Sequence, residues 1–236
     1  MNNSTLQLKI RERLNKLASN DYDNIECWQV VEAFNKVQIE WTRRQLRGSN
    51  IFQDGDEQSR RRVDDLQRLL VPGLAIPISD KGIYYETDDE LPVNYLEFKR
   101  VDVKAKNECC EDKRPMTVYL AEEGNRAQLL RDQHKKPSFE WAETFLTLVS
   151  NKIRIFTNDE FELADAELTY YRFPRYIQIE GCVDPYTLQA SATDVECEFK
   201  DDIVELLIDE TVAVLAGDIE SGNQFGRGTE SAERNN

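Results

Sequence analysis

The period of the hydrophobic pattern changes twice along this chain of 236 residues, and this restricts the fold more than any other feature. Up to Pro72, apolar residues recur every three or four positions, as on helices that bury one face. Between residues 73 and 199, β-branched and aromatic residues bounded by turn signals predict strands. From residue 200 the helical period returns. The order of helices, strands and a further helix predicts an α+β protein rather than an alternating parallel fold.

The clearest predicted helix covers residues 27–47, where the apolar positions are Cys27, Val30, Val31, Phe34, Val37 and Trp41. A short helix precedes it, and another is expected over residues 60–72, where Pro72 would end it. The most economical arrangement is a helical bundle formed by residues 1–72 and a returning C-terminal helix over residues 200–220. A mainly antiparallel β lobe, residues 73–199, would be inserted between them, and residues 221–236 are expected to form a flexible polar tail.

Two hairpins are expected within the β lobe. One turns around Asp80, Lys81 and Gly82, and in the other two strands meet across Ser150 and Asn151. The stretch LTYYRFPRYIQIEG, residues 168–181, is expected to supply a further strand.

The chain is strongly acidic, with 30 Lys and Arg against 45 Asp and Glu and a formal net charge of -15. This charge would repel a phosphate backbone, which argues against a DNA-binding protein that reads sequence but permits an acidic wall that DNA slides past. The N-terminus has no apolar core of signal-peptide length, so we expect a soluble protein made in the cytoplasm. The five cysteines lack a scaffold-like spacing and are expected to be reduced thiols.

Residue types that carry catalysis or bind metals are sparse. His134 lies among charged residues and is expected to be an exposed loop residue, while adjacent Cys109 and Cys110 lack the spacing of a zinc site. The acidic run Asp88–Glu90 lacks the spacing and the glycine of an EF-hand. We therefore expect no catalytic residue, no metal and no cofactor. A hydrolase or transferase using Cys110, His134 and Glu140 is the weakest of the alternatives.

Interaction surfaces are suggested instead by tyrosine and arginine, which are enriched where protein partners meet. The stretch 168–181 combines three tyrosines with two arginines, and the helix over residues 27–47 ends in a basic cluster. The candidate interface residues are Arg43, Arg44, Arg47, Tyr170, Tyr171, Arg172, Arg175 and Tyr176. The competing interpretation is a solvated helix end and an ordinary sheet with aromatic core residues.

Four segments carry a resemblance to a known group of proteins: VVEAFNKVQIEWTRRQLRG (30–48), LPVNYLEFKRVDVKA (91–105), the block from KPSFEW to GCVDP (136–185) and DDIVELLIDETVAVLAGDIES (201–221). In their overall residue pattern these segments resemble the virion structural proteins of crAss-like bacteriophages. More loosely, the order of elements is similar to that of the adaptor or gatekeeper proteins of short-tailed phages.

The resemblance implies a head–tail connector protein of the virion, not an enzyme. Many copies, twelve by the family symmetry, would form a ring below the portal protein and contact neighbouring connector or tail proteins. Double-stranded DNA would pass through the ring without specific binding, and no membrane would be involved. A non-viral oligomeric scaffold, or a protein-binding module without catalysis, is the alternative.

Overall fold

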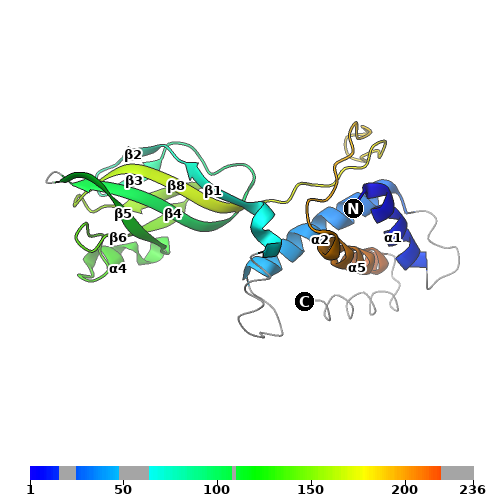
Figure 1. Cartoon of the computed structure of the whole chain (residues 1–236), viewed down its shortest axis with the longest axis horizontal. Helices are drawn as coiled ribbons and strands as arrows, with labels where there is room; N and C mark the ends of the chain where they lie inside the picture. Colours follow the sequence, from blue (N-terminus) through cyan, green and yellow to red (C-terminus); the bar gives the residue numbers. More distant parts are fainter. Residues whose placement is uncertain (16–24, 48–63, 108–109, 219–236) are drawn as a thin grey trace. The chain divides into compact units, whose positions relative to one another are not determined.

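The computed structural model describes residues 1–15, 25–47, 64–107 and 110–218, coloured along the chain in Figure 1. It divides the chain into two compact units. Unit 1 comprises Met1–Arg68 and Pro174–Asn236, and unit 2 comprises Leu69–Phe173.

Unit 2 is built around one sheet of eight strands in the order β1-β8-β4-β5-β6-β7-β3-β2. Its strands are β1 (Leu70–Ala75), β2 (Ile78–Asp80), β3 (Tyr84–Thr87), β4 (Tyr95–Asn107), β5 (Cys110–Leu120), β6 (Glu143–Val149), β7 (Lys152–Phe156) and β8 (Glu162–Arg172). Neighbouring strands are antiparallel except β5 and β6, which are parallel. Their connection contains a 3-10 turn (Glu123–Asn125) and the short helix α4 (Arg126–Arg131), as a parallel crossover requires.

The sheet is curled so strongly that its two edges approach each other, as the short connection between β1 and β2 shows. These strands are consecutive in sequence but lie at opposite ends of the sheet order, with only Ile76 and Pro77 between them. Three peptide units span at most about 11 Å, so the two edges of the sheet must come close together. The connection is tied to both sides: the Ile76 amide donates to the Ala166 carbonyl at 3.0 Å, and the Pro77 carbonyl accepts from the Asp88 amide at 3.1 Å.

The two predicted hairpin turns are confirmed. The β2–β3 turn contains Gly82 at φ 87°, and its amide donates to the Asp80 carboxylate at 2.7 Å. The β6–β7 turn places Ser150 and Asn151 at φ 51° and 62°, the positive values that two-residue turns between twisted strands require. Inside the curled sheet, alternating side chains form the hydrophobic core, which includes Val101, Val103, Leu146, Ile153, Ile155, Phe161, Leu163 and Leu168.

Unit 1 contains α1 (Asn3–Asn15), α2 (Cys27–Arg47) and α5 (Asp201–Asp218), and α5 packs against both other helices. Its buried side chains come from all three helices: Leu6, Ile10, Leu14, Val30, Phe34, Val37, Trp41, Ile203, Leu207 and Ile208. The Trp41 ring also meets Phe199 edge to face, with centroids 5.2 Å apart.

The segment 174–200 of unit 1 has little regular structure, and side-chain amides satisfy part of its backbone. Asn35 of α2 accepts from the Ile177 amide at 2.9 Å and donates to the Ile177 carbonyl at 3.3 Å. Buried Asn3 of α1 donates to the carbonyls of Gln178 and Val195 at 2.8 and 3.0 Å. Together with isolated antiparallel bridges between Gln178 and Val195 and between Val183 and Ala190, these amides fix the path of the segment.

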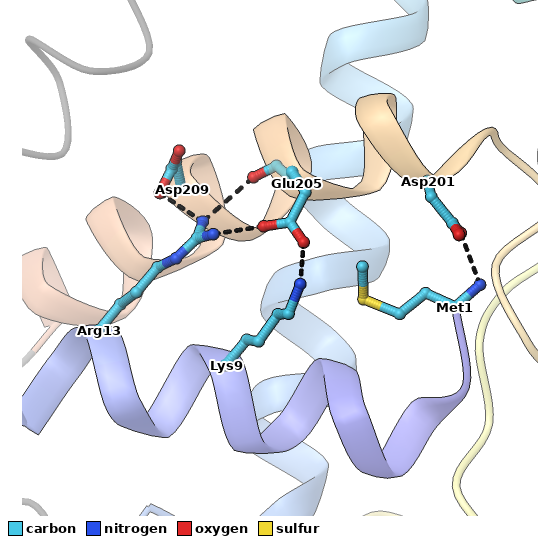
Figure 2. A network of polar contacts seen from close by, with 6 residues as sticks. All are labelled: Met1, Lys9, Arg13, Asp201, Glu205 and Asp209. Atoms are coloured by element: carbon cyan, nitrogen blue, oxygen red, sulfur yellow. Dashed lines mark hydrogen bonds and ion pairs between the residues drawn. The ribbon is translucent and has the colours of Figure 1, made fainter.

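An ion-pair network joins α1 to α5. Figure 2 shows Lys9 and Arg13 reaching from α1 to Glu205. Arg13 also pairs with Asp209, with Nη1 and Oδ1 2.5 Å apart. The amino group of Met1 lies 2.7 Å from Asp201, at the start of α5. The ammonium group of Lys9 and the guanidinium of Arg13 hold the pKa of Glu205 below its usual 4.5, although partial burial opposes them.

We expect Glu205→Gln to lower the free energy of unfolding of unit 1 by about 1 kcal/mol, because the network is partly exposed and screened. The contribution of Glu205 is complete above its unfolded pKa and is lost as the pH falls through the lowered folded pKa. Urea unfolding at neutral pH and at about pH 3 should therefore show a difference between wild type and variant that shrinks in acid. A difference that is constant or grows on acidification would contradict the network.

The expectation of reduced thiols is wrong for two of the cysteines. Cys27, the first residue of α2, and Cys182 form a disulfide with their Cα atoms 5.8 Å apart. They are 155 positions apart in the sequence, so spacing alone could not pair them. Cys197 is free and buried, and burial raises the pKa of its thiol to about 11.

Replacing both Cys27 and Cys182 by serine is expected to destabilise unit 1 by about 2–4 kcal/mol, since the bond closes a long loop. Denaturant unfolding followed by tryptophan fluorescence measures this, and Cys197→Ala is the control variant. Reducing agent should lower the stability of the wild type to that of the double variant and leave the double variant unchanged. Titration of both thiols in the oxidised native protein would rule out the bond.

The predicted fold requires correction. The protein is α+β, but its main element is the large curled sheet of eight strands with only a few helices, not an N-terminal helical bundle carrying an inserted lobe. The expected helix over residues 60–72 is confirmed only in part of its described range: residues 64–66 are α-helical and Gln67–Leu69 form a 3-10 turn, but Leu70 already begins β1. From Leu70 onward, the pairing of β1 with β8 outweighed the helical tendency that the spacing of the leucines had indicated. The expected flexible tail lies outside the described residues.

Candidate interaction surfaces

The two tyrosines of the predicted interface that belong to β8 are buried within unit 2. Tyr170 is 3% exposed, and its hydroxyl lies 3.0 Å from Asn94 Oδ1 while its ring packs on Tyr95 at 5.7 Å. Tyr171 is 8% exposed, and its burial raises the pKa of its hydroxyl. Both side chains therefore contribute to the packing of unit 2.

The remaining part of the Tyr-Arg stretch is more accessible. Half-buried Arg172 donates to the Phe173 carbonyl at 3.1 Å. The exposed guanidinium of Arg175 lies 3.3 Å from buried Glu198, which also accepts from the Arg175 amide at 2.9 Å. The Tyr176 side chain is 55% exposed. Tyr176 is thus available to a partner, whereas Arg175 fixes the start of the segment 174–200.

The arginines of the basic cluster at the end of α2 lie in different environments. Arg43 is exposed, but Arg44 turns inward and pairs with Glu210 of α5. Burial raises the pKa of Glu210 in spite of Arg44, whose charge and hydrogen bond oppose the shift. Arg44 therefore holds α2 to α5, and the side chain of Arg47 lies outside the described part of the chain.

A compact loop in unit 1, residues 182–191, presents apolar side chains to solvent. Its neck is closed by hydrogen bonds from the Ser191 amide to the Cys182 carbonyl at 2.8 Å and from the Gly181 amide to the Ser191 carbonyl at 3.0 Å. Asp184 organises the tip: its carboxylate accepts from the Tyr186 amide at 2.8 Å and the Thr187 hydroxyl at 3.0 Å. The loop is thus held by its own backbone and by the disulfide at Cys182.

Three apolar residues of this loop form what we call the loop patch: Val183, Tyr186 and Leu188. Tyr186 and Leu188 are each 81% exposed, and Val183 is 48% exposed. Leu188 has φ 56°, a conformation that costs a residue with a side chain free energy and persists only where its surroundings enforce it. The loop patch is therefore a preorganised apolar projection, and such projections often serve as contact anchors.

Tyr186 also lines a cavity of about 360 Å³ between α2 and α5. The other lining residues are Ile25, Trp28, Gln29, Glu32, Ala33, Lys36, Val214 and Leu215. The lining combines apolar side chains with the polar groups of Gln29, Glu32 and Lys36, a mixture that protein interfaces also have.

Unit 2 has a separate cavity of about 940 Å³, bordered by the exposed side chain of Trp141. His134 and Glu140 line this cavity together, while the side chain of Cys110 lies outside the described residues, as does all of Cys109. Within the described ranges, no group of three or more His, Cys, Asp or Glu residues could hold a metal ion.

No protein-family model and no curated protein matches the chain. None of the described helices has the length and apolar character that a membrane crossing requires.

The candidate surface differs from the one predicted from sequence. Tyr186, Leu188 and Trp141 were not among the predicted interface residues, because exposed apolar side chains in short loops follow no period. The available signals were weak: Asp184 and Pro185 favour a turn directly before Tyr186, and Trp141 lies near the start of the strand predicted to end at Ser150.

Proposed function

We propose that this chain is a structural subunit of a bacteriophage head–tail connector, where identical copies form a closed ring below the portal. The resemblance of four of its segments to virion structural proteins of crAss-like phages supports this origin. Its partners would be further copies of itself, the portal protein and neighbouring connector or tail proteins. Its location would be the head–tail junction of the virion.

The loop patch is the observation that carries the proposal. Tyr186 and Leu188 are 81% exposed on a rigid loop beside an open cavity, so their side chains contribute little to the stability of a monomer. Exposed apolar surface of this kind indicates contact with a partner. A neighbouring copy that covers this surface would bury both side chains without first having to order them. Repeated head-to-tail contacts of this kind give a ring whenever the rotation between neighbours closes.

The charge of the chain is consistent with a DNA channel. A net charge of -15 disfavours tight binding of a phosphate backbone, so DNA could move past a ring of such subunits without being held. The basic Arg44 is already paired with Glu210, and Arg175 is paired with Glu198.

Quantitative mass spectrometry of purified virions, from a phage that encodes this chain, tests the proposed location. We expect the chain to be present at a fixed ratio to the portal protein and to cross-link to it or to the adjacent ring. Absence from the purified particles would refute the proposal and favour a scaffold or binding module outside the virion.

A further inference from the structure

We propose that the cavity beside Trp141 binds a cationic side chain, an arginine or lysine presented by a basic segment of a protein partner. The inference concerns unit 2 and does not depend on the ring. It rests on the exposed indole, on the fixed turn that carries it and on the carboxylates that surround the cavity.

The turn that carries Trp141 is rigidly built. Ser138 and Glu143 exchange backbone hydrogen bonds at 2.9 and 3.2 Å, and the Ala142 amide donates to the Phe139 carbonyl at 3.2 Å. Ala142 has φ 54°, which a residue with a side chain adopts only when its surroundings enforce it. The turn holds the Trp141 side chain 76% exposed at the border of the cavity.

Arg114 supports the same turn from within unit 2. Its guanidinium donates to the carbonyls of Phe139 and Glu140 at 3.0 and 3.3 Å, and it lies over the Phe139 ring at 5.8 Å from the centroid. One aromatic face of this turn is thus already engaged by a cation of the chain. The larger and more strongly attracting indole of Trp141 is mostly exposed to solvent.

The charges around the cavity favour a positive ligand. Glu140, Glu143 and Glu160 line it, and Lys136 pairs with Glu160 at 2.8 Å, which compensates one carboxylate. Glu140 and Glu143 are exposed and line the same cavity as Trp141. A guanidinium or ammonium group in the cavity would meet the negative face of the indole and these carboxylates together, and the two attractions add. The site is therefore complementary to a cationic side chain in charge and in chemistry.

Titration of the full-length protein with the peptide acetyl-Gly-Arg-Gly-amide, followed by the NMR signals of the indole NH groups, tests the proposal. The signal of Trp141 is identified by its absence from Trp141→Phe. We expect a saturable shift of this signal and little change at Trp28 or at buried Trp41. Trp141→Ala should weaken peptide binding about fivefold or more, and Glu143→Gln should weaken it by a similar factor. Both positions are exposed, and circular dichroism checks that the variants fold.

Two controls separate a specific site from attraction to an acidic protein. The peptide acetyl-Gly-Gln-Gly-amide should cause no saturable shift, and Glu180→Gln, an exposed substitution in unit 1, should leave arginine binding unchanged. Equal weakening by Glu180→Gln and Glu143→Gln would overturn the proposal, as would unchanged binding by Trp141→Ala. A Trp141 shift caused by methyl glycosides but not by the arginine peptide would also overturn it, in favour of a carbohydrate site.

Discussion

Replacing Arg44 by alanine is expected to destabilise unit 1 by about 2–4 kcal/mol, although the sequence left open whether this residue belongs to an interface or to a solvated helix end. The loss arises because Glu210, whose side chain is 11% exposed, would keep its charge without its partner. The expected value is below that of a fully buried pair, because the Arg44 side chain is itself 36% exposed. Arg43→Ala is the matched control on the same helix and should change the stability by less than about 0.5 kcal/mol.

The pH dependence of this loss has a definite sign. Burial raises the pKa of Glu210, Arg44 opposes that shift, and nearby Glu40 and Asp209 reinforce it. Without Arg44 the pKa rises further, so the penalty for a buried charge is full at neutral pH and decreases as the pH falls through the raised value. Stability of Arg44→Ala relative to wild type should therefore improve between pH 7 and about pH 5.

Urea unfolding monitored by tryptophan fluorescence measures these differences. A second variant tests whether the loss of stability comes from the unpaired charge of Glu210. Adding Glu210→Gln to Arg44→Ala removes the buried charge and should restore most of the lost stability. If Arg44→Ala behaves like Arg43→Ala at neutral pH, or if Glu210→Gln gives no rescue, Arg44 does not act by neutralising Glu210.

Removal of the loop patch is expected to have the largest effect on assembly. Tyr186→Ala combined with Leu188→Ala should weaken self-association about 100-fold or more, because exposed rigid anchors of this kind dominate binding energies. Unfolding temperature should remain near that of wild type, since each side chain is 81% exposed and contributes little to the core. Sedimentation velocity over a range of concentrations measures the association.

Leu8→Ala provides the matched control, because Leu8 is a 66% exposed apolar residue on α1 of the same unit. It should leave association unchanged. Loss of association in the Leu8 variant to the same degree would point to general hydrophobic adhesion. Full association of the double variant would show that the loop patch lies outside the contact.

Local pattern predicted the hairpins and α2 because their signals lie within a few neighbouring residues. Gly82 and the pair Ser150-Asn151 supply the positive φ values of their turns, and α2 has an apolar stripe along its whole length. The residues that determine these elements lie within the elements themselves, so the sequence alone was sufficient to predict them.

The sheet and the contact surfaces could not be predicted in the same way. Leu70 continues the helical spacing of Leu66 and Leu69, yet β1 begins at Leu70 because β8, about 100 residues away, offers a partner strand. Arg44 and Tyr170 resemble surface residues in sequence but have partners at Glu210 and Asn94, which are distant in sequence. The disulfide likewise depends on tertiary proximity, and the loop patch follows no local period.

Native mass spectrometry of the purified chain, alone and mixed with the portal protein of the same phage, tests whether the chain forms the proposed ring. We expect one closed oligomer of fixed copy number, formed alone or on the portal, and its loss when Tyr186 and Leu188 are replaced by alanine. A chain that stays monomeric at every concentration and forms no complex with the portal would contradict it.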